Sequence, residues 1–294
     1  MTLSWPLIAY VMLGVACAGT LGTQGVLALR GRGGKVHLYS AILALVLCLG
    51  AMAAAVARLG RVDRVFNVLA HLSSGISQGY AVLIVFAAAA VVAIVAIHRD
   101  EDNSMPRWCG VMCVIVALLT AYGIAANLTA TGLHAGKTLL ATAYLVAAAL
   151  AAGFFVMSIM FTLCHDESCP APLLALGSTI ASAATGILAY IFATIAPTLG
   201  IRATQIVKSD YGMVGIHPTQ GINASVQNDQ LVLWVLALVV GALVPLVISL
   251  IARKIKGAGS AGINALGVIA VLVGVAATVS LALFSGQAVQ LLSR

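Results

Sequence analysis

The chain has 294 residues, of which 62% are hydrophobic and only 8% are charged, with a net charge of +7. Soluble domains carry roughly 25% charged residues, so the composition excludes an ordinary soluble protein and indicates one that crosses a membrane several times. The basic residues lie between apolar segments, where lipid headgroups and membrane topology account for them, so the positive charge does not indicate binding to nucleic acid.

Eight apolar stretches approach or exceed the roughly 20 residues that a helix needs to cross the hydrocarbon layer of a bilayer. In chain order they cover residues 5–29, 38–57, 79–97, 108–127, 138–163, 172–198, 230–252 and 261–285. Backbone groups in lipid must bond within their own segment, and the alternation of a membrane barrel is absent, so each stretch predicts a helix. We therefore expect an all-α bundle of about eight transmembrane helices, formed by one integral membrane domain over residues 1–294.

The loops between these spans predict the topology. The opening residues MTLSWP lack the features of a cleaved secretory signal, so we expect the first span to be retained. Eight spans place both termini on one side, and the basic clusters RGRGGK (30–35) and RKIK (253–256) favour the opposite side as cytoplasmic. The termini, residues 57–79 and the long polar segment 199–229 are then expected outside. Pro197 and Pro245 are expected to kink or end their helices.

Several common redox and transport sites are missing from the sequence. A haem held in a helix bundle usually needs two histidines within spans, but all six lie in loops or at span ends: His37, His71, His98, His134, His165 and His217. No cysteine run typical of an iron–sulfur cluster occurs, so we expect neither haem nor cluster in this chain. The spans also lack a central ionisable residue of the kind that pumps and proton-coupled transporters use, which leaves a facilitator as the transport alternative.

Other polar residues have ordinary explanations. CHDESC at 164–169 offers metal ligands, but no second pair of ligands accompanies it, so a polar loop with two thiols is the preferred interpretation. Cys109 and Cys113 are one helical turn apart and are expected to pack in the core. Gln24, deep in the first span, is expected to bond to a neighbouring helix rather than to line a cavity.

The stretch at residues 57–79 is the best candidate for a site. Arg58, Arg61 and Arg64 recur every third residue and share a face if the segment is helical. Four apolar residues, Val62, Val65, Phe66 and Leu69, would form the other face of a short interfacial helix, and the small polar run SSGISQG follows. Arginines at span ends also reach lipid headgroups, but a polar niche here suits a molecule with an oily tail and a polar head, such as a quinone. Lipid headgroups and a docking subunit are the competing occupants.

The same stretch resembles a motif of the membrane anchor subunit of the dimethyl sulfoxide reductase family. That motif is close to His-Leu-Gly-x-Pro-x-Arg-Ala-x-Asn, followed by Leu-Ser-x-Glu. Here residues 58–67 are RLGRVDRVFN and residues 76–79 are ISQG. The length, the eight spans and WPL at 5–7 are also similar. Arg58 stands where the family has histidine and Gly79 where it has glutamate, the two residues that the family associates with quinol oxidation.

The resemblance implies a multi-pass subunit of the bacterial cytoplasmic membrane that oxidises menaquinol in anaerobic respiration. Electrons would pass to an iron–sulfur partner subunit and then to a catalytic subunit with a molybdopterin cofactor. The residues expected to line or support the niche are Arg58, Arg64, Asn67, His71, Ser77 and Gln78. Arginine and glutamine do not accept a proton at ordinary pH, so Arg58 would hold a quinone oxygen or stabilise a quinolate while His71, Asp63 or water takes the proton. A purely structural anchor and a small-molecule transporter or facilitator are the alternatives.

Overall fold

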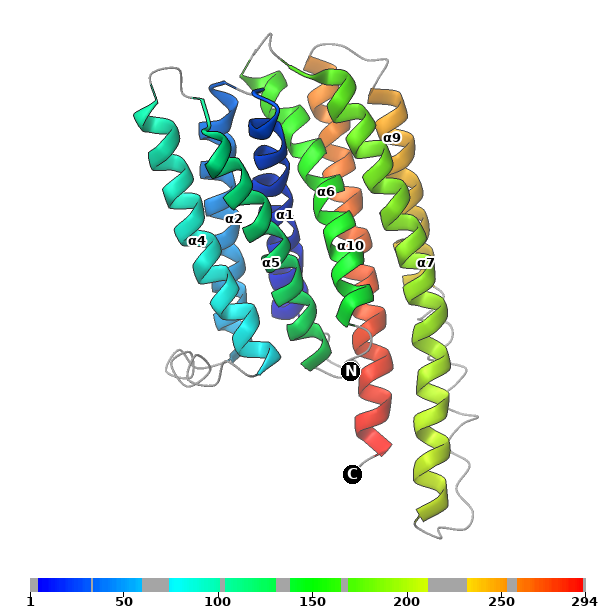
Figure 1. Ribbon diagram of the computed structural model, residues 1–294. Coiled ribbons are helices and arrows are strands. Elements are labelled where there is room, and N and C mark those ends of the chain that lie inside the picture. The colour runs from blue at the N-terminus through cyan, green and yellow to red at the C-terminus, as the bar shows by residue number, and fades with distance from the viewer. Residues whose placement is uncertain are drawn as a thin grey trace.

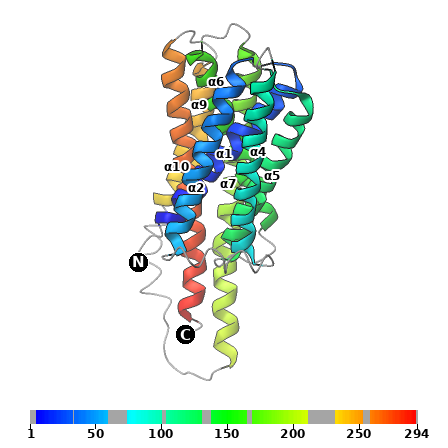
Figure 2. The ribbon, with the colours of Figure 1, turned by 90° about the vertical axis from the view of Figure 1, so that its left-hand side faces the viewer.

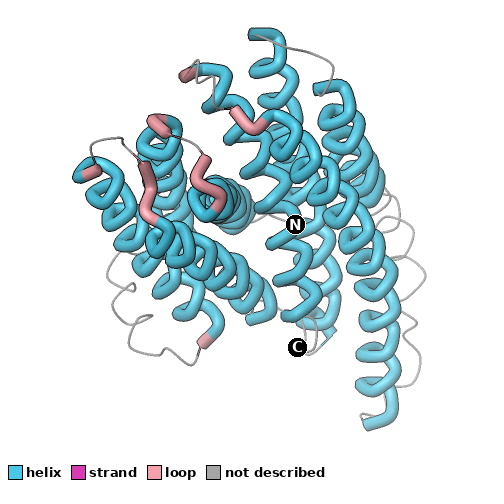
Figure 3. Tube along the Cα trace, turned by 45° about the horizontal axis from the view of Figure 1, so that its top comes forward, coloured by secondary structure: helices cyan, strands magenta, loops and turns pink. Residues whose placement is uncertain are grey.

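The chain folds into a bundle of membrane-spanning helices (Figure 1). The computed structural model describes residues 5–32, 34–59, 74–100, 104–130, 138–164, 169–210, 232–252 and 258–292. Among them only helices and short loops occur, without a strand (Figure 3). Eight of the helical segments are long and apolar enough to cross a membrane, which confirms the all-α polytopic fold expected from the sequence.

Consecutive spans run in opposite directions along the bundle (Figure 1). Their helices are α1 (Trp5–Leu29), α2 (Val36–Leu59), α4 (Gly75–Arg99), α5 (Arg107–Ala130), α6 (Thr138–Leu163), α7 (Ala171–Asp210), η2 (Leu236–Leu243), α9 (Val244–Ala252) and α10 (Ala258–Leu292). The seventh span, Val232–Ala252, contains η2 and α9. The helix α1 begins and α10 ends at the end of the bundle where α2 also ends, and we call this the Arg58 end.

The helices pack as two groups of four spans. One group contains α1, α2, α4 and α5, and the other contains α6, α7, the seventh span and α10. The main joint between the groups is the contact of α1 with α6 (Figures 1 and 2). Most of α1 is buried because its sequence GVACAGTLGTQG is dominated by small residues, which let neighbouring helices approach closely.

The outer surface is suited to lipid. Large apolar side chains on several helices point outward, among them Val46, Leu49 and Ile84. Trp5 and Trp108 are exposed at the starts of α1 and α5, which lie at opposite ends of the bundle. Tryptophans at both ends match the aromatic belts that membrane proteins place at the two interfaces.

The seventh span is irregular around Pro245. Its segment Leu236–Leu243 is a π-helix, and the N–H of Val244 bonds to the carbonyl of Val239, five residues back. A proline has no N–H and its ring clashes with the carbonyl four residues earlier in an α-helix. The wider π turns before Pro245 relieve that clash. The proline therefore alters the geometry of this helix without ending it.

Two helices are longer than the apolar stretches predicted. The 40 residues of α7 span about 60 Å at 1.5 Å per residue, roughly twice the thickness of the hydrocarbon layer. Because α7 continues through Pro197 to Asp210, the prediction of a loop beginning at 199 is wrong. Both α7 and α10 extend beyond the other helices at the Arg58 end (Figure 1). The rest of the predicted loop, residues 211–229, lies outside the described residues.

Candidate functional site

The arginine at the end of α2 is fixed to the end of another helix. Arg58 is half-buried in the last turn of α2. Its Nη1 donates a hydrogen bond of 2.8 Å to Oδ1 of Asn127, which lies near the end of α5 and is only 1% exposed. Hydrogen bonds to a charged group are about twice as strong as neutral ones. The bond therefore fixes the guanidinium at the edge of the bundle, against the polar side chain of a buried residue.

A tyrosine and a glycine complete this polar group. Tyr10 of α1 is 1% exposed, and its hydroxyl lies beside the side chain of Asn127 without forming a hydrogen bond within the described part of the chain. A Cβ built on Gly79 of α4 would lie 2.7 Å from Oη of Tyr10 and 3.0 Å from Nδ2 of Asn127. The four helices α1, α2, α4 and α5 thus bring together Arg58, Asn127, Tyr10 and Gly79, which we call the rim cluster.

A second tyrosine holds the helix ends around this cluster. The hydroxyl of Tyr80 donates a hydrogen bond to the backbone carbonyl of Ala55. Ala55 lies three residues before Arg58 in α2, and Tyr80 directly follows Gly79 in α4. The bond therefore ties the end of α2 to the start of α4 beside the rim cluster.

The predicted site residues have different outcomes. Arg58 belongs to the rim cluster, whereas Arg64, Asn67 and His71 lie outside the described residues, as do Asp63 and the predicted interfacial helix. Ser77 and Gln78 are both in the first turns of α4, where Ser77 is buried and Gln78 is half-buried. The backbone carbonyl of Gln78 faces α5, because a Cβ built on Gly123 would lie 3.4 Å from it.

Sequence reasoning missed Tyr10 and Asn127. No motif or period singles them out, since each is one polar residue near the end of an apolar span. The signal that the sequence offers is their position. Tyr10 lies near the start of the first span and Asn127 near the end of the fourth, and both of these span ends are at the Arg58 end. Helices that alternate in direction bring such positions to one level, although the level does not specify which of them make contact.

The rim cluster can bind a polar group, but its side chains are poor proton acceptors. Arg58 stays charged at ordinary pH, and a carboxamide and a phenol are neutral there. Within the residues described here the neighbours of Arg58 are Asn127, Tyr10 and Tyr80, none of which is acidic. The cluster is therefore a positively charged, hydrogen-bonding patch at the rim of an apolar bundle.

At the opposite end, Gln24 bonds to a neighbouring helix as predicted. Its Nε2 donates a hydrogen bond of 2.9 Å to the backbone carbonyl of His37 in α2 and lies 3.6 Å from Sδ of Met105. The ring of His37 in turn lies 2.8 Å, through Nε2, from the carbonyl oxygen of Arg32. These contacts close the end of α1 against the loop that precedes α2.

No metal site is found in the described chain, where no three His, Cys, Asp or Glu residues come together. Cys109 and Cys113 are both fully buried, which agrees with their expected packing role. His165, Asp166 and Glu167 of the CHDESC loop lie outside the described residues.

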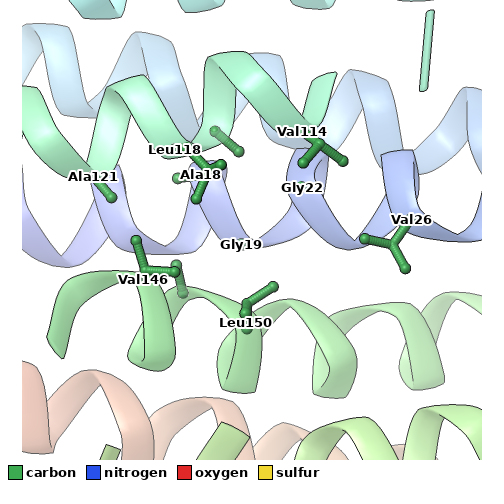
Figure 4. Close-up of a pocket in the computed structure, with 11 residues that line it drawn as sticks. Ala18, Gly19, Gly22, Val26, Val114, Leu118, Ala121, Val146 and Leu150 are labelled. Atoms are coloured by element: carbon green, nitrogen blue, oxygen red, sulfur yellow. The ribbon is translucent and has the colours of Figure 1, made fainter. Parts of the chain in front are cut away.

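An apolar pocket of about 190 Å³ lies between α1, α5 and α6 (Figure 4). It is lined by Ala18, Gly19, Gly22, Val26, Val114, Ala117, Leu118, Ala121, Val146, Ala149 and Leu150. None of these side chains is polar, so the pocket is unsuited to a polar head group. Along α5, Ile124 lies between Ala121 of the pocket and Asn127 of the rim cluster. Ile124 packs on Gly14, which lies along α1 between Ala18 of the pocket and Tyr10 of the rim cluster. The pocket and the rim cluster are therefore separate features.

The rim cluster and the resemblance of residues 58–79 remain the two guides to function, because no family model, no characterised protein and no solved structure matches the chain.

Proposed function

We propose that this chain is the membrane anchor of a dimethyl sulfoxide reductase-like molybdenum complex and that it oxidises menaquinol at the Arg58 end. The observation that carries the proposal is the bond between Arg58 and Asn127. It holds the first residue of the family-like stretch inside the rim of the bundle instead of leaving it in open lipid. A guanidinium in this position can donate hydrogen bonds to a quinol oxygen that arrives from the membrane.

The reaction divides the work between this chain and its partners. Oxidation of a quinol to a quinone releases two electrons and two protons. The electrons would pass to the iron–sulfur subunit and from there to the molybdopterin subunit. Arg58 stabilises negative charge on the quinol oxygen, and His71, Asp63 or water takes the protons, since neither Arg58 nor Gln78 accepts one at ordinary pH.

The long helices give the partner a place to dock. Both α7 and α10 extend beyond the other helices at the end that carries the rim cluster (Figure 1). A partner that binds these extensions lies at the same end of the bundle as the rim cluster. We place this end, together with both termini, outside the bacterial cytoplasmic membrane, on the side opposite the basic clusters at 30–35 and 253–256.

Composition of the purified complex tests the proposal first. The chain is purified in mild detergent, and iron, labile sulfide and molybdenum are measured in the preparation. All three are expected to co-purify. Recovery of the chain alone from native membranes, without any of these elements, would contradict the assignment to this class of complex.

Quinol oxidation tests the site. Reduction of the iron–sulfur clusters by a menaquinol analogue is expected to fall at least about tenfold in Arg58→Ala, in line with loss of a charged hydrogen bond. The matched control is Arg99→Ala, which removes an exposed arginine at the opposite end of α4. Unchanged reduction by quinol in Arg58→Ala rejects the site. Reduction by soluble dyes without any reduction by quinol indicates the alternative, a purely structural anchor.

The second group of helices supports a different candidate, a facilitator for a small neutral molecule. This group contains a 3.0 Å contact between the hydroxyl groups of half-buried Thr179 and buried Ser249, and the Oγ of buried Ser182 has no partner among the described residues. The π-helical segment lies in the same group, and such segments often occur at functional sites. Uptake of a neutral solute by vesicles that contain only this chain would favour the facilitator over the anchor.

A further inference from the structure

The polar atoms of the rim cluster are mostly hydrogen-bond donors. A guanidinium has five N–H donors and no acceptor. The carboxamide of Asn127 has one acceptor oxygen, and that oxygen already receives a bond from Arg58. The amide N–H groups of Asn127 and the hydroxyl of Tyr10 remain, and this hydroxyl can accept a hydrogen bond as well as donate one. The buried polar atom of the cluster that makes no hydrogen bond to the described residues is therefore the hydroxyl oxygen of Tyr10.

The hydroxyl of Tyr10 is the clearest sign of a missing hydrogen-bond partner. It is buried and without a partner, whereas the hydroxyl of the nearby Tyr80 bonds to the carbonyl of Ala55. Buried polar groups in folded proteins nearly always have a partner, so an exception requires an explanation such as a water or a bound ligand. A phenylalanine would fill the same space without that cost, and the hydroxyl therefore points to an external oxygen.

Gly79 leaves room for this hydroxyl. Any side chain at position 79 would begin with a Cβ 2.7 Å from Oη of Tyr10, closer than real Cβ atoms come to a neighbour. Tyr10 and a larger residue at 79 thus exclude each other in this packing. Position 79 therefore supplies no side-chain acceptor for the hydroxyl of Tyr10.

We propose that Tyr10, Asn127 and Arg58 together bind one acceptor oxygen, the carbonyl or ionised hydroxyl oxygen of a lipid-soluble quinone. The inference deepens the proposed function and rests on it. The oxygen lies near Gly79, where it accepts hydrogen bonds from the hydroxyl of Tyr10 and from an N–H of Asn127, and the guanidinium of Arg58 supplies positive charge. A phospholipid phosphate oxygen has the same acceptor chemistry, and the experiment separates the two sources.

The test uses the purified full-length chain and a short-chain naphthoquinone, with binding followed by calorimetry. In Tyr10→Phe, which removes only the hydroxyl, the dissociation constant is expected to rise about tenfold. The thermal midpoint without quinone is expected to stay equal or to rise, because an unpartnered buried hydroxyl is removed. The matched control is Tyr80→Phe, which loses the bond to Ala55 and is expected to lower the midpoint without changing the dissociation constant.

A second variant supports the donor assignment independently. Asn127→Asp keeps an oxygen for Arg58 and replaces the amide donor by an acceptor, so it is expected to raise the dissociation constant by a similar factor. Unchanged naphthoquinone affinity in both Tyr10→Phe and Asn127→Asp would overturn the proposal and leave a water as the partner of Tyr10.

A parallel titration with vesicles of anionic phospholipid identifies the source of the oxygen. A Tyr10→Phe effect confined to the quinone supports the site as proposed, and an effect confined to the phospholipid overturns the quinone assignment. The proposed function is tested by other measurements, the metal content and the quinol oxidation of the complex. These titrations use the chain alone, so the two proposals can fail independently.

Discussion

Gly19 of α1 and Gly153 of α6 meet backbone to backbone at the joint between the two groups of helices. A Cβ on Gly19 would lie 2.0 Å from the carbonyl oxygen of Ala149, and a Cβ on Gly153 would lie 2.1 Å from the carbonyl oxygen of Gly19. Helices in lipid associate through close van der Waals packing because the lipid tails are as apolar as the side chains. These two glycines therefore set how closely the two groups approach.

Replacement of Gly153 by alanine is expected to destabilise the chain by about 2 kcal/mol or more, since the added methyl overpacks against backbone atoms that have no rotamer to change. The better helix propensity of alanine, about 1 kcal/mol, offsets only part of this. The measurement is the thermal unfolding midpoint in detergent. Gly262→Ala in α10 is the matched control, because nothing lies within 4 Å of a Cβ built on Gly262. The midpoint of this control is expected to remain unchanged or to rise slightly. Equal midpoints for the two variants would contradict the close joint.

Asn127→Leu is expected to lower the stability of the chain by about 1 kcal/mol. It removes the acceptor of a charged hydrogen bond, and partial exposure of Arg58 to solvent limits the loss. Asn127→Asp keeps an oxygen for the guanidinium, and its stability is expected to stay close to that of the wild type. A double-mutant cycle with Arg58→Leu measures the coupling directly, and a coupling of zero would show that the two side chains do not interact.

The sequence predicts the fold well because hydropathy reports burial in lipid. All eight spans occur close to their expected positions, and the errors concern α7 and α10, which continue past the apolar stretches. Hydropathy marks where the apolar stretch ends. It does not mark where the helix ends, because the backbone hydrogen bonds of a helix can continue outside the lipid. Lipid burial also explains why the bond of Gln24 to another helix could be predicted, since a buried polar group within a span needs a partner.

The site is less predictable because its contacts join distant parts of the chain. The motif-like stretch indicates Arg58, but its partner Asn127 lies 69 residues away, on a helix whose rotation only the packing determines. Tyr10 contacts the cluster because position 79 is a glycine. The sequence shows that glycine as a departure from the family pattern, and the structure supplies its steric consequence.

Gln24→Glu is expected to destabilise the chain far more than Gln24→Leu. The amide of Gln24 donates to the carbonyl of His37 and is fully buried. Leucine loses that bond, which costs about 1 kcal/mol, but also removes a carbonyl oxygen that has no partner. An ionised glutamate instead places a negative charge beside a carbonyl oxygen in a dry environment, at a cost of several kcal/mol. The difference is expected to shrink at pH 4, where the carboxylate gains a proton, and thermal midpoints at pH 4 and pH 7 measure it.

Thiol labelling is expected to report the orientation of the bundle. Cys17, Cys48, Cys109 and Cys113 are fully buried, whereas Cys164 and Cys169 are partly exposed at the end opposite Arg58. A membrane-impermeant maleimide should therefore modify at most two cysteines per folded chain, because access limits thiol reactivity. If the basic clusters mark the cytoplasmic side, labelling occurs in inverted vesicles and is absent in intact spheroplasts. A Cys164→Ser, Cys169→Ser double variant controls for reaction at the buried thiols, and its labelling should fall to background. Labelling of the wild type in intact spheroplasts would instead place the Arg58 end, and the quinol site proposed there, on the cytoplasmic side.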